Sequence, residues 1–295
     1  MATVTLAFGL DLAVAEPPRW LHPVSWFGRA VAPADRAWGT PRLAGLALAA
    51  SAPLAAAGLA AGLVTLGLRV HPAAGVLCAG LVLFSATSYR RLLVVAREVI
   101  AATDSDLDCA RTRLRALAGR DAAGLSAGEI RSAAIESTAE NLADGFTAPL
   151  AAFVVLAPVS LAAAAGGAAW AKAVNTLDSM VGYPSKPVGW ASARLDDLLM
   201  WVPARLTALL LALAAGDVRA LQRARRWAHE PSSPNSGWPM ATLATVLGVR
   251  LEKPGAYTLC PEYGHPDSTA AENGVTIASR AGLLGAVLAG GLAWL

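Results

Sequence analysis

Long apolar runs, separated by polar stretches, set the pattern of this 295-residue chain. Residues 43–68 contain only Ala, Leu, Gly, Val, Pro, Ser and Thr, and residues 73–88 form a second apolar run after a tight turn at 69–72. An apolar helix of about 18 or more residues is long enough to cross the hydrocarbon core of a bilayer. The pattern therefore predicts a membrane-spanning helical hairpin over residues 43–88.

The remaining apolar segments are shorter or interrupted. Residues 147–171 are broken by Pro158 and Gly166-Gly167, and residues 198–215 carry Pro203. The pattern predicts an all-α, polytopic membrane helical bundle with about four to five apolar segments, some of them broken or re-entrant. Taken as a single membrane-embedded domain, residues 1–295 divide into an interfacial segment 1–42, the hairpin 43–88, a charged helical region 89–146, broken membrane segments 147–215, a polar region 216–280 and a short C-terminal apolar helix 281–295.

Composition agrees with this class and excludes others. Hydrophobic residues make up 55% of the chain and charged residues only 15%, with a mean hydropathy of +0.49; soluble domains carry about 25% charged residues. The net charge is +3, and no basic stripe with interleaved aromatic residues indicates nucleic-acid binding. The three cysteines lack CxxC spacing, which argues against a zinc site or a disulfide framework.

The sequence allows two placements of residues 172–197, either outside the membrane or on the same side as the arginine-rich regions. Regions 89–146 and 216–280 are rich in arginine and are expected on the cytoplasmic side. Two crossings between them would place residues 172–197 outside, unless 147–171 is re-entrant or 172–197 folds back into the bundle. Non-helical backbone at membrane depth is tolerated only where it lines a cavity. The expected active site is a polar cavity between helix ends, open to the cytoplasmic side.

Three acids recur at helical spacing before an apolar run. Glu136, Glu140 and Asp144 stand at positions i, i+4 and i+8, and so share one face of a regular helix. Their mutual repulsion would be relieved by a divalent cation, and Mg²⁺ takes carboxylate oxygens together with substrate phosphates. The alternative is a solvated acidic face, which the adjoining apolar segment disfavours because acids near lipid are costly.

A second motif combines a lysine with hydroxyl and amide side chains. Its members on one helical face are Lys172, Asn175, Thr176 and Ser179. Asp178 lies beside this face, and Gly182 is expected to end the helix. A lysine with hydrogen-bonding helpers suits phosphate binding, whereas the alternative is a polar loop with a snorkelling lysine.

Further candidates lie in the polar segments on either side. Arg194 and Asp197 are spaced for an i, i+3 ion pair, and the Asp196-Asp197 pair could complete a Mg²⁺ site or could simply face a helix N-terminus. Asn235 or Ser236 is expected to cap a helix. His22 titrates near neutral pH in its unperturbed state. Neither a Walker A motif nor a GxGxxG turn is present, so an ATP site would be of another type.

Together these motifs resemble the CobD/CbiB family of cobalamin biosynthesis. The longest are AIESTAENLADG at 134–145, NTLDSMVGY at 175–183, SARLDD at 192–197 and PNSGWPM at 234–240. Shorter ones are LDL at 10–12, EPP at 16–18, HPV at 22–24, GR at 28–29, Lys172 and RLEKPG at 250–255. The resemblance follows chain order over nearly the whole sequence; residues 41–131 match only in their apolar and charged character.

The resemblance implies an adenosylcobinamide-phosphate synthase of the bacterial cytoplasmic (inner) membrane. Such a ligase joins the side-chain carboxylate of adenosylcobyric acid to (R)-1-amino-2-propanol or its O-phosphate, using ATP to form an acyl phosphate. The metal ligands implied for Mg²⁺ are Glu140, Asp144, Asp196 and Asp197. The catalytic residues implied are Glu136, Lys172, Asp178 and Arg194. The substrate-binding residues implied are His22, Arg29, Ser137, Asn141, Asn175, Thr176, Ser179, Tyr183, Asn235 and Ser236.

Other functions remain open on the residues alone. A transporter also has broken apolar segments, but its acids are expected near the bilayer midplane and its halves often repeat. A scaffold for other corrinoid enzymes would leave the polar motifs unexplained. A related membrane enzyme could act on another phosphorylated substrate. Partners beyond the bilayer and the substrates would be other corrinoid enzymes or further copies of this chain.

Overall fold

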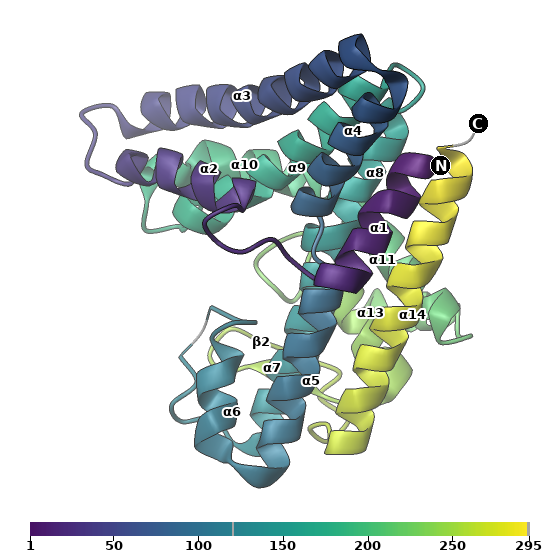
Figure 1. Ribbon diagram of the computed structural model, residues 1–295. Coiled ribbons are helices and arrows are strands. Elements are labelled where there is room, and N and C mark those ends of the chain that lie inside the picture. Colours follow the sequence, from purple (N-terminus) through teal and green to yellow (C-terminus); the bar gives the residue numbers. More distant parts are fainter. Residues whose placement is uncertain (120, 294–295) are drawn as a thin grey trace. The chain divides into compact units, whose positions relative to one another are not determined.

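The computed structural model describes residues 1–119 and 121–293 and is mostly helical, as Figure 1 shows. The predicted polytopic helical membrane fold is confirmed. The backbone separates into two compact units, which are described here one at a time. Unit 1 contains residues 1–88, 144–200 and 286–295, and unit 2 contains residues 89–143 and 201–285.

Unit 1 is built around a long apolar hairpin. Helices α3 (Pro41–Val70) and α4 (Pro72–Ala86) are joined at His71, whose Nδ1 accepts a hydrogen bond from Ala73 N (3.1 Å) and so caps α4. Pro72 at the first position of α4 lacks the N–H that a helix start would leave unpaired. The other elements of this unit are α1 (Ala2–Val14), α2 (Pro23–Val31), η1 (Ala32–Ala34), α8 (Ala148–Leu156), α9 (Leu161–Val181), η3 (Pro187–Gly189) and α10 (Trp190–Leu199).

Unit 2 is helical apart from one short hairpin. Strands β1 (Leu251–Lys253) and β2 (Tyr257–Leu259) pair antiparallel, with Leu251 opposite Leu259, so the expectation of an all-α chain misses these six residues. The helices are α5 (Arg90–Ser105), α6 (Leu107–Leu114), α7 (Ala127–Leu142), α11 (Trp201–Ala214), α12 (Ala220–Ala224) and α13 (Gly237–Leu247). Helix α14 (Ser268–Leu292) begins in unit 2 and ends in unit 1, and the π-helical turn η2 (Ala143–Thr147) bridges the same boundary.

Three helical stretches among the described residues are long and apolar enough to span a membrane. They are Pro41–Val70, Pro72–Ser105 and Ser268–Leu292, and the bent pair Pro187–Leu199 with Trp201–Ala214 makes a fourth if counted as one span. The expectation of a short C-terminal helix over 281–295 is therefore wrong. The helix begins at Ser268, where Asp267 Oδ1 accepts from Ala270 N (2.7 Å), and its polar first turns gave no apolar signal.

Gly166 and Gly167 do not break the third apolar segment, contrary to expectation. Helix α9 runs through both, and the interruption lies at residues 157–160. A Cβ on Gly166 would come within 3.1 Å of Ala57 O in α3, and one on Gly167 within 2.5 Å of Leu156 Cδ1 at the end of α8. The glycines therefore let helices pack closely, as small residues do in membrane bundles.

Several helix ends and one buried helix face follow from short sequence patterns. Ser126 and Glu129 form a capping box at the start of α7, and Gly182 ends α9 as expected. The apolar stripe of α5 at Leu92, Val95, Ala96 and Val99 is buried. Ser236 precedes α13 as expected but makes no side-chain capping bond.

The three acids Glu136, Glu140 and Asp144 do not all lie in one regular α-helix. The regular helix α7 ends at Leu142, and the wider π turn η2 follows it. Glu136 and Glu140 therefore lie in regular α-helix, whereas Asp144 lies in a π turn, which is wider than an α-helical turn.

Candidate active site

Lys172 is the centre of a charged cluster within unit 1. It lies on α9, and the carboxylates that act on it electrostatically are Asp144, Glu16 and Asp196. Burial lowers the pKa of the Lys172 ammonium, and these three carboxylates oppose that effect. Four elements of one unit thus bring opposite charges to the same place.

Ser88 ties two members of this cluster together. Its hydroxyl donates to Glu16 Oε1 (2.6 Å), and its backbone N–H donates to Gly145 O (2.8 Å), the residue after Asp144. The prolines at 17 and 18 fix the chain just beyond Glu16. The sequence motif EPP therefore marks a carboxylate of this cluster that was not among the predicted site residues.

His22 lies at the edge of the cluster. It caps α2, where its Nδ1 accepts a hydrogen bond from Val24 N (3.3 Å). Burial lowers the pKa of the imidazole, Glu16 raises it and Lys172 lowers it again. The ring is therefore mostly neutral at neutral pH and is able to accept a proton.

Asp178 follows Lys172 on α9 and has a strongly perturbed carboxyl group. Its Oδ1 is buried without a hydrogen-bond partner, and a Cβ at position 182 would overlap that oxygen. Burial, helped by the charge of Asp197, raises the pKa of Asp178 to about 6. A carboxyl group with this pKa exchanges its proton in the pH range where a general base works.

The Asp178 shift predicts how stability depends on pH. The unfolded chain loses this proton near pH 3.8, whereas the folded protein keeps it up to about pH 6. Stability should therefore fall as the pH rises from 4 to 6 and then level off for this group. Asp178→Asn should flatten that part of the curve, measured as the thermal midpoint in detergent between pH 4 and 7. Identical pH profiles for the variant and the parent would contradict a raised pKa.

The remaining predicted residues of unit 1 have distinct environments. Arg194 and Asp197 form the expected i, i+3 pair (3.7 Å), which is weak because the Arg194 side chain is 70% exposed. Thr176 and Ser179 each donate to the carbonyl four residues earlier, at Lys172 and Asn175. Arg29 and Tyr183 are exposed, and Asn175 is buried.

The other predicted residues belong to unit 2. These are Glu136, Ser137, Glu140, Asn141, Asn235 and Ser236. Glu136 is fully buried and accepts hydrogen bonds from Ser132 Oγ (3.0 Å) and Tyr257 Oη (3.0 Å). Ser132 Oγ in turn accepts from Glu252 N (2.7 Å). Glu136 therefore links α7 to the β-hairpin.

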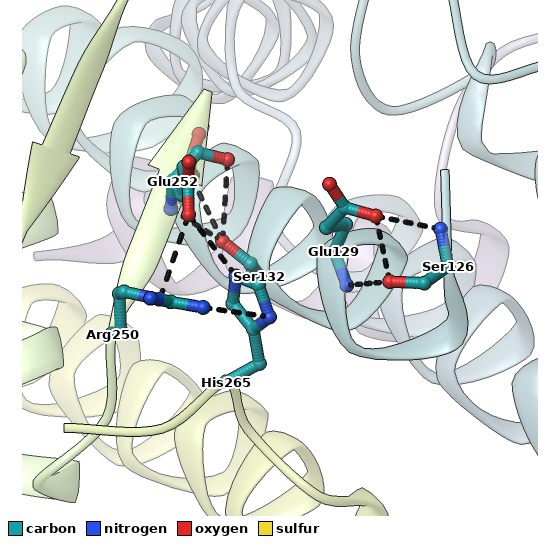
Figure 2. Close-up of polar contacts among 7 residues, drawn as sticks. Ser126, Glu129, Ser132, Arg250, Glu252 and His265 are labelled. Carbon is teal, nitrogen blue, oxygen red and sulfur yellow. Dashed lines mark hydrogen bonds and ion pairs between the residues drawn. The ribbon is translucent and has the colours of Figure 1, made fainter. Parts of the chain in front are cut away.

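Figure 2 shows the polar group around this hairpin. Glu252 Oε2 lies 3.5 Å from Arg250 Nε and 3.3 Å from His265 Nε2, while Arg250 Nη2 lies 3.3 Å from His265 Nδ1. Ser132 lies beside these three residues, and the capping pair Ser126 and Glu129 lies on the same helix. The contacts hold residues 250–265 against α7.

Removing the Tyr257 hydroxyl tests this link. Tyr257→Phe takes one donor from a buried carboxylate, which costs about 1–3 kcal/mol. The thermal midpoint of the purified protein should fall. The matched control is Tyr263→Phe, because Tyr263 is 44% exposed. Equal midpoints for the two variants would contradict the link.

An arginine missed by the sequence analysis is held between two indoles. The Arg205 guanidinium lies 4.4 Å from the Trp201 ring centre and 5.1 Å from that of Trp238, and it donates to Asn235 Oδ1 (3.1 Å). Arg205 lies inside an apolar run of the sequence, and this position could have identified it. A charged side chain in such a run costs free energy unless it has partners. The predicted site residue Asn235 thus orients this arginine.

The described residues offer no cage for a metal ion. No group of three or more His, Cys, Asp or Glu side chains in the described chain is placed to hold one. Mg²⁺ nevertheless binds in enzymes through one or two carboxylates and substrate phosphates. Asp144 and Asp196 beside Lys172 fit that incomplete donor set.

The comparisons with known proteins identify the family. A family model described as "CobD/Cbib protein" matches residues 4–281. The chain belongs to the CobD/CbiB family. It is 34% identical over 301 residues to the "Probable cobalamin biosynthesis protein CobD" of Methanothrix thermoacetophila, covering 97% of this chain and 95% of that protein. No solved structure matches the chain.

Two bacterial CobD proteins give the same result. The "Cobalamin biosynthesis protein CobD" of Klebsiella pneumoniae is 38% identical over 271 residues, covering 85% of this chain and 82% of that protein. The protein of the same name from Geobacter metallireducens is 40% identical over 272 residues, covering 87% and 82%. The resemblance found in the motifs is confirmed, and the chain is a cobalamin biosynthesis protein with membrane-spanning helices.

Proposed function

We propose that this CobD/CbiB protein is an amide-forming ligase. It joins the side-chain carboxylate of adenosylcobyric acid to (R)-1-amino-2-propanol or its O-phosphate, at the cytoplasmic membrane of a bacterium. The observation that carries the proposal is the Lys172 cluster, where a lysine meets Asp144, Glu16 and Asp196 beside the perturbed Asp178. Acid, base and cation within one unit are what carboxylate activation and amine attack require.

Each residue of the site has a proposed role in the reaction. ATP phosphorylates the corrinoid carboxylate, which gives an acyl phosphate and ADP. Lys172 binds phosphate oxygens and offsets the negative charge that develops at the carbonyl. Asp178 takes a proton from the ammonium of the amino alcohol, since its pKa of about 6 leaves it mostly ionised at neutral pH. The free amine then attacks the carbonyl carbon, and inorganic phosphate leaves.

Mg²⁺, when bound, neutralises phosphate charge in such reactions. Asp144 and Asp196 are the residues proposed to hold it together with ATP phosphates. Glu140 and Asp197 remain weaker candidates, since Glu140 belongs to unit 2 and Asp197 pairs with Arg194.

A reconstituted assay tests the proposal. The purified protein in nanodiscs receives adenosylcobyric acid, one of the two amine forms, and Mg-ATP either present or omitted. We expect a corrinoid product whose mass equals the sum of acid and amine less one water, and only when ATP is present. The absence of such a product with both amines would overturn the proposal; product formed equally without ATP would overturn the phosphoryl step alone.

A further inference from the structure

A cavity of about 470 Å³ lies in unit 1, lined by residues outside the Lys172 cluster. It is bounded by the segment 35–38 after η1, by Pro41 at the start of α3, and by the segment 185–188 before α10. Two cationic residues, Arg36 and Lys186, line it together with Trp38 and Ser185. No step of the proposed reaction uses these residues.

Arg36 is preorganised on a fixed aromatic surface. Its guanidinium carbon lies 4.2 Å from the centre of the Trp38 ring, and Trp38 Nε1 donates to Ala34 O (2.9 Å), which fixes the indole. Within the described chain Arg36 makes no ion pair with a carboxylate. A stacked guanidinium keeps its planar edge free, and that edge matches two oxygens of a phosphate group.

Lys186 is partly neutralised by its neighbours. Its Nζ donates to Asp35 Oδ2 (2.6 Å) and to Met180 O (3.2 Å), which leaves one of three N–H groups for another acceptor. With Asp35 counted against the two cations, the cavity walls carry one net positive charge. Arg36 therefore supplies the main attraction for an anion, while Lys186 and Ser185 add single hydrogen bonds.

The position of the cavity in the fold determines which ligands can enter it. Pro41 opens the apolar helix α3, and the exposed side chains of Leu43 and Leu46 follow within two turns. Tryptophans are favoured at the boundary between lipid and water, and Trp38 precedes the first residue of the apolar helix α3 by three positions. The cavity is therefore at the water end of a membrane span, within reach of lipid headgroups and of soluble esters.

We infer that this cavity binds a phosphate group through Arg36, Ser185 and Lys186, with Trp38 as its wall. The phosphate belongs either to an anionic phospholipid or to a soluble phosphate ester. This binding is separate from amide formation and is measured without corrinoid or ATP, so its failure and that of the proposed function are distinguishable.

Two binding measurements on the full chain distinguish the sources. Native mass spectrometry after release from nanodiscs counts the phosphatidylglycerol retained, with phosphatidylcholine as the reference lipid. Calorimetry in detergent measures affinity for O-phosphoethanolamine. Each is made on the parent, on Arg36→Gln and on the control Arg42→Gln, because Arg42 is exposed in the first turn of α3 and does not line the cavity.

The expected result is at least about a tenfold loss of binding in Arg36→Gln and little change in Arg42→Gln. A loss confined to phosphatidylglycerol supports the site with a lipid as its ligand, and a loss confined to O-phosphoethanolamine supports it with a soluble ester. No binding of either probe, or binding that Arg36→Gln leaves unchanged or that both variants lower equally, overturns the inference.

Discussion

Lys172→Met is expected to lower the rate of amide formation by about a hundred- to a thousandfold. A single preorganised donor aimed at developing charge typically contributes that much. Removing the ammonium also leaves Asp144, Glu16 and Asp196 without the cation that faces them. Initial rates of corrinoid product formation at saturating amine and ATP measure the effect.

The control for this prediction is Lys253→Met. Lys253 is an exposed lysine of β1 in unit 2 and should keep the rate of the parent. Gel filtration and thermal unfolding of both variants separate a catalytic loss from misfolding. A well-folded Lys172→Met protein with turnover within about threefold of the parent would exclude Lys172 from the chemistry, because removing such a donor costs far more.

Gly45→Ala is expected to destabilise unit 1 by about 1–3 kcal/mol, the usual cost of overpacking. Gly45 lies in the membrane helix α3, and a Cβ there would overlap the backbone carbonyl of Val188. A backbone atom cannot rotate away as a side chain can, so helix and loop must move apart. The thermal midpoint in detergent measures the loss.

Helix α3 supplies the matched control. Gly58→Ala adds the same methyl group to the same helix, where nothing lies within 4 Å of the new Cβ. Alanine is also the better helix former, so Gly58→Ala should leave stability unchanged or raise it. Equal effects of the two substitutions would show that α3 does not pack on the Val188 carbonyl.

Membrane helices were predictable because composition alone marks them. The hairpin expected at 43–88 appears as α3 and α4, displaced by at most two residues at its ends. Local polar signals were equally direct, since the capping box of α7 and the glycine end of α9 depend on neighbouring residues. Features that depend only on residues close together in the chain can be predicted from the sequence without knowledge of the fold.

The site was harder to predict because its partners are distant in sequence. Ser88 and Glu16 are 72 residues apart, and Tyr257 and Glu136 are 121 residues apart. The resemblance implies a catalytic role for Glu136, and the hydrogen bonds from Ser132 and Tyr257 show that this residue also holds the β-hairpin. The π turn at Ala143–Thr147 likewise has no sequence signal that helical periodicity detects.

The central claim is that the protein activates a corrinoid carboxylate and converts it to an amide. Adenosylcobyric acid labelled with ¹⁸O at both oxygens of the side-chain carboxylate tests this claim most directly. With the purified protein, amine and Mg-ATP, one label should remain in the amide of the product and one should appear in inorganic phosphate. Unlabelled phosphate, or a carboxylate recovered without amide, would contradict the account.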